Sequence, residues 1–165
     1  MHKYILCMTT IELQVSKSKV MTEVAETTSY VGQKMPVSGD APIDYYDRIF
    51  TTDEDRQMLE RFWVEACDAA TSALRHDIII TRPQTVSHGC DLTKDYEIIL
   101  GLPVGFNDSL VGTMNTVLFS YCVNSILGKW FMITNKEEAA AYSTAAEGQL
   151  ADVVNMTYQR RRPMR

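Results

Sequence analysis

Residues 106–133, FNDSLVGTMNTVLFSYCVNSILGKWFMI, and residues 134–159, TNKEEAAAYSTAAEGQLADVVNMTYQ, decide the fold of this 165-residue chain. Apolar residues cover most of the circumference of a helix formed by the first segment, which predicts a long, enclosed central helix. In the second segment apolar residues recur at intervals of three and four, which predicts a helix with one inward face. Because only a short link separates the two helices, they should form an antiparallel pair.

Polar residues mark the start of each of these helices. Asn107 or Asp108 is suited to accept a hydrogen bond from the first free backbone N–H groups of the central helix. Thr134 and Glu137 have the spacing of a capping box, in which two side chains satisfy the backbone at a helix start. The sequence therefore predicts that the second helix begins close to residue 134.

A third helix is predicted over residues 51–74, TTDEDRQMLERFWVEACDAATSAL. Thr51 and Glu54 again have capping-box spacing, and the acidic residues 53–55 suit the positive end of a helix dipole. The side chains on its inward face become small towards the C-terminal end, so that another helix can approach closely. The aromatic residues of the three helices fit core packing better than a ligand pocket: Phe62, Trp63, Trp130 and Phe131.

The N-terminal region combines a strand with a short helix. Ile11, Leu13 and Val15 alternate with polar residues, which is typical of a strand with one buried face. Residues 18–35 contain valines at helical spacing but many threonines, so we expect a short helix that needs a surface to pack against. Residues 36–42, PVSGDAP, form a loop that separates this N-terminal arm from the body.

Two β-branched or aromatic runs, Ile78–Ile80 and Tyr96–Leu100, predict a two-stranded antiparallel element between the helices. The expected fold is therefore mainly α with some β structure: a bundle of about three long helices, a β-hairpin and an extended N-terminal arm. The chain divides into an arm (1–40), a helical body (41–159) with its hairpin near 78–101, and a basic tail (160–165).

Charge is distributed unevenly along the chain. The net charge is −5, and without the four tail arginines it would be −9. An acidic body repels a phosphate backbone, which argues against general nucleic-acid binding over most of the surface. The longest apolar segments contain polar residues, which argues against a membrane span. Four scattered cysteines and the absence of a signal-peptide pattern favour a soluble protein made in a reducing compartment, with Met8 as a possible alternative start.

No pattern in the sequence predicts enzymatic chemistry. The chain lacks a GxSxG motif, an HExxH motif and a glycine-rich phosphate loop. His88 and Cys90 are the only close pair of soft metal ligands, and zinc requires three or four protein ligands. Gly89 between them is better explained as a turn residue. The sequence therefore predicts neither a catalytic residue, nor a metal site, nor a cofactor.

The tail is the strongest candidate site. Arginine pairs bidentately with carboxylate or phosphate, and four arginines exceed what a helix end requires. The proline stops the helix at or before Arg162, so we expect residues 160–165 to leave the body and become ordered on docking to an acidic protein surface or, less favoured, to nucleic acid. Tyr45 and Tyr46 either cover the core or take part in an interface with another molecule. The predicted docking residues are Arg160, Arg161, Arg162, Pro163 and Arg165.

Three stretches together resemble small virion proteins of phages and prophages of gut Bacteroidetes. They are residues 8–35 (MTTIELQVSKSKVMTEVAETTSYVGQKM), residues 49–71 (IFTTDEDRQMLERFWVEACDAAT) and residues 128–165 (GKWFMITNKEEAAAYSTAAEGQLADVVNMTYQRRRPMR). The arrangement of arm, helix, hairpin, two long helices and basic tail is also similar to head–tail connector proteins, the portal adaptors. Those proteins are small helical adaptors that form a ring beneath the portal.

This resemblance implies a structural protein of the virion, assembled in the cytoplasm of a bacterial host, that forms a twelvefold ring through which DNA passes. The implied partners are the portal protein, further copies of the chain and a downstream tail or ring protein. The strand residues Ile11, Leu13 and Val15, with Tyr45 and Tyr46, are possible contacts between subunits. Tail-terminator or tail-completion proteins are alternatives within the same class, and a small nucleic-acid-binding protein is the alternative outside it.

Overall fold

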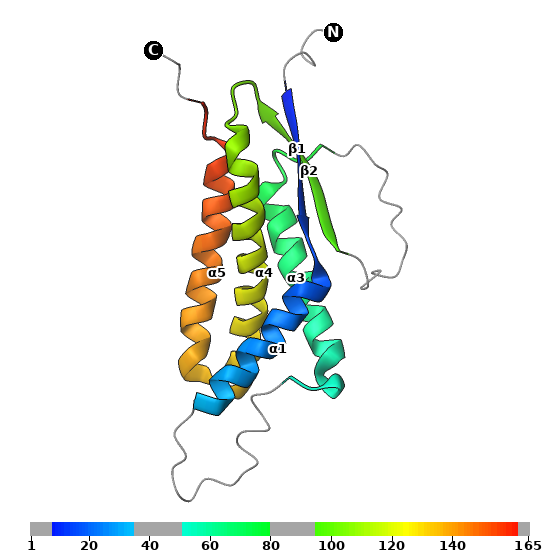
Figure 1. The fold of residues 1–165 in the computed structure, drawn as a ribbon, viewed down its shortest axis with the longest axis vertical. Coiled ribbons are helices and arrows are strands. Elements are labelled where there is room, and N and C mark those ends of the chain that lie inside the picture. The colour runs from blue at the N-terminus through cyan, green and yellow to red at the C-terminus, as the bar shows by residue number, and fades with distance from the viewer. Residues whose placement is uncertain (1–7, 35–50, 80–94, 162–165) are drawn as a thin grey trace, which may run out of the picture.

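A computed structural model describes residues 8–34, 51–79 and 95–161 of the chain (Figure 1). As predicted, the fold is mainly helical with a two-stranded antiparallel sheet. The described elements, in chain order, are β1 (Met8–Val15), α1 (Lys17–Lys34), a 3₁₀ turn η1 (Asp53–Asp55), α3 (Arg56–Leu74), β2 (Tyr96–Pro103), a second 3₁₀ turn η2 (Asp108–Leu110), α4 (Val111–Thr134) and α5 (Lys136–Thr157).

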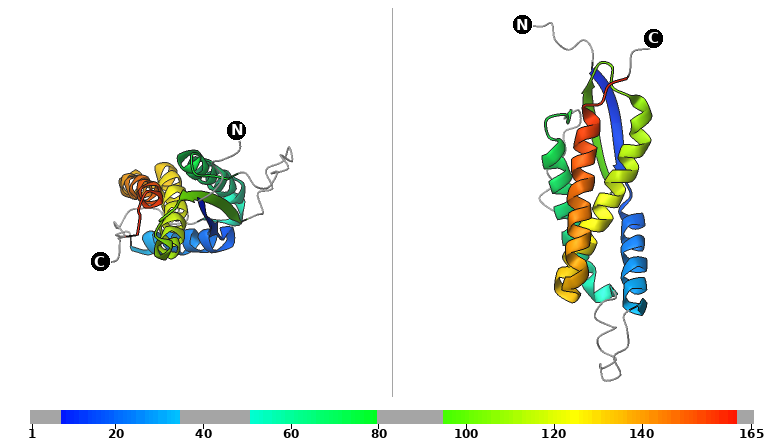
Figure 2. Two further views of the ribbon diagram at one scale, coloured as in Figure 1. Left: turned by 90° about the horizontal axis from the view of Figure 1, so that it is seen from above. Right: turned by 90° about the vertical axis from the view of Figure 1, so that its left-hand side faces the viewer.

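The body is an elongated bundle with α4 at its centre (Figures 1 and 2). α5 runs antiparallel beside α4, with only Asn135 between them, which confirms the predicted pair. α3 and α1 pack on other sides of α4, and the sheet covers its N-terminal half. The enclosure of α4 is confirmed by its ten buried residues: Met114, Leu118, Tyr121, Cys122, Val123, Ile126, Leu127, Gly128, Trp130 and Phe131.

Helix α1 forms over almost the whole of the segment 18–35 in which the sequence predicts a short helix. It spans 18 residues, and Val20, Val24 and Thr28 form a buried stripe along it. The stripe has a spacing of four residues, so it lies on one face and packs against α4. Tertiary packing therefore compensates for the weak helix propensity of its threonines.

The partners in the sheet differ from the predicted ones. β1 pairs antiparallel with β2 along its whole length, so that Leu13 lies opposite Ile98. The predicted partner of β2 contributes a single bridge, between Ile78 and Leu100. Residue 80 lies outside the described residues. β1 pairs along its whole length because its alternating apolar side chains complete the core beneath the sheet, while the 77–79 segment lies on the other side of β2.

The starts of the helices follow the predictions only in part. Asn107 is the N-cap of η2, and its side-chain oxygen accepts the N–H of Ser109. The cap before α3 lies one residue later than predicted: the Asp55 carboxylate accepts both the backbone N–H (2.9 Å) and the hydroxyl (2.8 Å) of Thr52.

The capping box predicted from Thr134 and Glu137 is wrong. The Thr134 hydroxyl donates to the carbonyl oxygen of Trp130 inside α4, and Asn135 is the residue before α5. Thr134 is still helical at the end of α4, so its side chain faces back along that helix and cannot cap the next one.

The segment Asp108–Thr134 is long and apolar enough to span a membrane by length and composition, with a mean hydropathy of 1.3 over its most apolar window. The central helix of a bundle meets the same criteria, and α4 occupies that position here. Phe62 and Trp63 of α3 and Trp130 and Phe131 of α4 are all buried, which confirms their predicted role in the core.

Candidate functional site

The C-terminal segment does not leave the body where the helix ends. α5 ends at Thr157, and the chain then continues beside the turn that follows β2. The N–H of Asn107 donates to the carbonyl oxygen of Gln159 (3.3 Å), and the N–H of Arg161 donates to that of Gly105 (2.8 Å). Arg160 lies between these hydrogen bonds and forms a bridge with Phe106. Backbone contacts therefore hold the segment as far as Arg161.

The turn that receives the C-terminal segment depends on Gly105. Its φ of +91° lies in the left-handed region, which a residue with a β-carbon rarely adopts. The turn is closed by a hydrogen bond from the N–H of Phe106 to the carbonyl oxygen of Pro103. This conformation leaves the carbonyl oxygen of Gly105 free to accept the N–H of Arg161.

A side-chain contact adds to the backbone contacts. The guanidinium of Arg161 pairs with the carboxylate of Asp108 in η2. Both side chains are more than half exposed (63 % and 51 %), so water screens the attraction and the pair adds little to the stability of the fold. Its effect is local, because it adds a side-chain contact between Arg161 and η2 to the backbone hydrogen bonds.

These contacts divide the predicted docking segment. Arg160 and Arg161 lie on the body of their own chain, so the expectation that the whole of 160–165 is free of the body is wrong for these two residues. Arg162, Pro163 and Arg165 lie outside the described residues. Sequence reasoning missed Asp108 as a partner of the tail, since its position at a helix start gave it another explanation.

Exposed apolar side chains lie at the same end of the bundle, where both termini emerge (Figure 1). Met8 at the start of β1 and Val104 in the turn after β2 are each 57 % exposed, and Tyr158 after α5 is 65 % exposed. Single exposed apolar side chains are common on protein surfaces, and these three add apolar area at this end of the bundle. This end therefore combines apolar side chains with the cationic Arg160 and Arg161.

The predicted inter-subunit residues on β1 are placed differently. Ile11, Leu13 and Val15 are buried inside the subunit (7 %, 0 % and 1 % exposed), so their side chains cannot contact a neighbour, and only the backbone of the strand could take part in the predicted contacts. Alternation along a strand turns these three side chains into the core and leaves the intervening residues in solvent. Tyr45 and Tyr46 lie outside the described residues.

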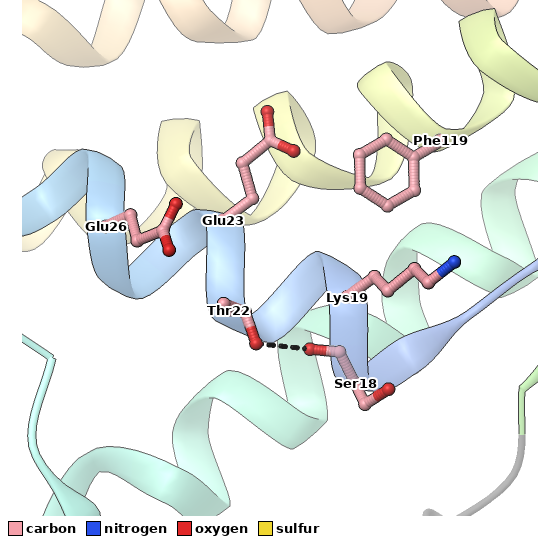
Figure 3. A pocket seen from close by; sticks show the side chains of 6 residues that line it. All are labelled: Ser18, Lys19, Thr22, Glu23, Glu26 and Phe119. Carbon is pink, nitrogen blue, oxygen red and sulfur yellow. Dashed lines mark hydrogen bonds between the residues drawn. The ribbon is translucent and has the colours of Figure 1, made fainter.

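A shallow groove of about 340 Å³ lies between α1 and α4 (Figure 3). Its chemistry is limited: Thr22 donates to the backbone of Ser18 within α1, and Phe119 is contributed by α4. The charged side chains on its α1 side lie in solvent. In the described parts of the chain, every buried side-chain nitrogen or oxygen has a hydrogen-bond partner, so none is left for a ligand to satisfy.

Two thiols and two phenols meet inside the bundle, and burial keeps all four protonated. Burial raises the pKa of Cys67 to about 12, with a further contribution from the charge of Asp68. Burial likewise raises the pKa of Tyr121 to about 12, and it raises the pKa values of Tyr96 and Cys122. Neutral groups of this kind serve packing rather than nucleophilic chemistry.

The Tyr96 hydroxyl reaches Thr71 in α3 at 2.9 Å. No group of three or more potential metal ligands occurs among the residues that the structure describes, and His88 and Cys90 lie outside them. Comparisons of the chain with protein-family models, curated proteins and solved structures find no match.

Proposed function

We propose that this protein is a structural adaptor of a phage head–tail junction, a connector that forms a ring between the portal and the tail and lets DNA pass. Its action is binding, without catalysis. The observation that carries the proposal is that the C-terminal segment is held against one end of the elongated body as far as Arg161, so that Arg160 and Arg161 have fixed positions there.

The anchoring of Arg160 and Arg161 supports docking in physical terms. A segment that starts from a fixed point loses less conformational entropy on binding than one that starts from a frayed helix end. The exposed Tyr158 and Val104 beside it supply apolar area, and the arginines supply bidentate pairing with acidic groups. In a ring each contact is repeated around the axis, so that modest affinities combine.

The charge of the body supports a channel that does not retain DNA. The net charge of −5 includes the four arginines, so the rest of the chain carries a net charge of −9. A body of this charge repels the phosphates of passing DNA. Tail-terminator and tail-completion rings also need a channel that does not retain DNA. The predominance of helices favours the connector over these alternatives.

The deciding experiment removes residues 162–165 and leaves the anchored Arg160 and Arg161 in place. The truncated protein should fold normally and lose binding to purified portal rings. Electron microscopy of the full-length protein with portal should show an additional ring bound to the portal ring, and that additional ring should be absent with the truncated protein. Unchanged portal binding by the truncated protein would overturn the docking role of the tail.

A matched variant separates the tail from its anchor. Arg161→Ala removes the ion pair with Asp108 and keeps the backbone hydrogen bonds and residues 162–165, so it should weaken portal binding much less than the truncation does. DNA binding tests the alternative function: four phosphate contacts predict a slope of about −3.6 for log affinity against log salt. Tight DNA binding with that slope, and none to portal, would replace the adaptor by a nucleic-acid-binding protein.

A further inference from the structure

The outer edge of β1 carries backbone groups that point away from the sheet. Ile79 N–H donates to Ile99 O and Gly101 N–H donates to Asp77 O, so the odd-numbered backbone groups of β2 face the 77–79 segment. The even-numbered ones therefore face β1, where Leu100 lies opposite Ile11. It follows that the odd-numbered backbone groups of β1 pair with β2, and that the even-numbered ones point outwards.

One of these outward groups is already satisfied. The N–H of Gln14 donates to the side-chain oxygen of Asn115 in α4, at 2.9 Å. This contact covers the end of the edge nearest α1. The N–H groups of Thr10 and Glu12 have no such partner among the described residues, and both side chains are exposed. Among the described residues, no group pairs with the outer edge at Met8–Glu12, and this part of the edge is called the open stretch below.

Among the described residues, this open stretch has one of the features that usually protect an edge strand, the charged side chain of Glu12. It contains no proline and no lysine, and β1 pairs with β2 in unbroken register without a bulge. An open edge is a template for another strand, because each new pair satisfies backbone groups on both chains.

The sheet offers this edge on one side only. On the other side, the two hydrogen bonds from the 77–79 segment cover β2 at Ile99 and Gly101. A sheet with two open edges extends into a fibre, whereas two sheets with one open edge each close on one another. The geometry therefore favours a closed pair over open-ended assembly.

We propose that β1 of a second copy of this chain pairs antiparallel with the open edge, about a twofold axis at Thr10. This register places Thr10 opposite its own counterpart and Met8 opposite Glu12 of the second copy. All three outward positions of the open stretch then form hydrogen-bonded pairs, each of which exchanges two backbone hydrogen bonds.

The side chains select this register over its neighbours. A facing pair of threonines is favourable across strands, and the half-exposed Met8 covers the aliphatic part of the facing Glu12. A shift that centres the axis on Glu12 places two like charges opposite one another, which destabilises pairing. That shift also requires the N–H of Gln14, which Asn115 already occupies.

This pairing is independent of the proposed adaptor function. A twofold contact uses the same edge on both copies, whereas ring contacts are heterologous and use other surfaces. The two also differ in their response to salt. Because both copies are acidic, salt screens their repulsion and should strengthen the β1 pair, while it weakens docking of the arginine tail.

The first test uses proline at the centre of the proposed pair. Thr10→Pro removes an N–H that points outwards and takes no part in pairing with β2, so the fold should tolerate it. Sedimentation analysis should show that it raises the dimer dissociation constant at least tenfold. Thr10→Val keeps the N–H and is the control, with a dissociation constant within threefold of the original. Circular dichroism and a thermal unfolding curve establish that both variants fold.

The second test fixes the register by cross-linking, in a background in which Cys7 and Cys90 are replaced by serine. Thr10→Cys should give a disulfide-linked dimer under mild oxidation, because the two facing Cα atoms lie about 5.5 Å apart in such a pair. Glu12→Cys should not, since the two copies of residue 12 are separated by about 14 Å along the strands.

Several outcomes would overturn the proposal. The first is a protein that stays monomeric at all concentrations. The second is a dimer that Thr10→Pro leaves intact. The third is cross-linking through Glu12→Cys in preference to Thr10→Cys. Loss of portal binding on removal of residues 162–165 would leave the β1 pair unaffected, so a failure of either proposal can be recognised separately.

Discussion

The backbone of Gly128 in α4 lies directly against Ser143 in α5. A β-carbon on Gly128 would come within 2.7 Å of the Ser143 hydroxyl oxygen and 3.2 Å of its backbone nitrogen. The two longest helices of the bundle therefore meet at a point where one of them has no side chain. This contact allows the antiparallel pair to pack closely along its length.

Gly128→Ala should accordingly destabilise the protein by about 1–3 kcal/mol, because the added methyl group must displace the backbone of α5. Urea denaturation measures the change in the free energy of unfolding. Gly112→Ala is the matched control in the same helix, since nothing lies within 4 Å of its added β-carbon. That substitution should stabilise the protein by up to about 1 kcal/mol through helix propensity. Equal effects of the two substitutions would contradict the close contact.

Tyr121→Phe tests a hydrogen bond that joins α4 to α3. The buried phenolic hydroxyl of Tyr121 donates to the carbonyl oxygen of Ala66 at 3.1 Å. Its loss should lower the free energy of unfolding by about 1 kcal/mol, the usual net value of such a bond. Tyr158→Phe removes a hydroxyl from a side chain that is 65 % exposed and should change stability by less than about 0.5 kcal/mol.

Phe131→Ala tests the centre of the core. The Phe131 side chain is completely buried and its ring centroid lies 5.2 Å from that of Tyr142 in α5. Truncation should lower the free energy of unfolding by about 3–5 kcal/mol, because it combines lost burial with a cavity. Ile133→Ala, two residues further along α4 at 60 % exposure, is the control and should cost less than about 1 kcal/mol.

Alkaline pH should destabilise the fold through the buried thiols and phenols. The pKa values of Cys67 and Tyr121 rise from 9.0 and 10.0 to about 12 on folding, because burial disfavours the charged forms. The stability that results is complete below the ordinary pKa values and is lost as the pH rises from about 9 towards about 12. Denaturation midpoints over this range measure the loss. Tyr121→Phe should reduce the pH dependence, and an unchanged slope would contradict the assignment.

Asp108→Asn tests the side-chain contact between η2 and the C-terminal segment. Global stability should fall by less than about 1 kcal/mol, because the ion pair with Arg161 is exposed. Amide hydrogen exchange at Arg161 should nevertheless become faster, since its hydrogen bond to Gly105 loses support. Asp152→Asn, an exposed substitution on α5, should leave that exchange rate unchanged. An unaltered rate in Asp108→Asn would show that the backbone contacts suffice.

Periodicity along the chain was sufficient to predict α3, α4 and α5, the antiparallel pairing of the last two, and the burial of Phe62, Trp63, Trp130 and Phe131. It was also sufficient to identify the face of β1 that carries Ile11, Leu13 and Val15 as apolar. These properties depend on residues three or four apart in a helix and two apart in a strand, so neighbouring residues already contain them.

The main partner of β2 could not be predicted in this way. The short run at 78–80 is near β2 in sequence, and proximity favours it as a partner. The structure instead pairs β2 with a strand more than 80 residues earlier, as shown by Val15 opposite Tyr96. The helix expected over residues 18–35 forms up to Lys34 because α4 provides the surface that its valines need.

The candidate site shows the same contrast between properties set by the local sequence and properties set by contacts between distant segments. The sequence by itself determined that the chain ends in a cationic segment on an acidic body, because charge is a property of composition. Only the tertiary structure decided that Arg161 is held by Gly105 and Asp108, and that Ile11, Leu13 and Val15 face inwards while the Met8–Glu12 backbone edge remains open. Those outcomes depend on which distant segments meet, and burial of the common core selects among the possible meetings.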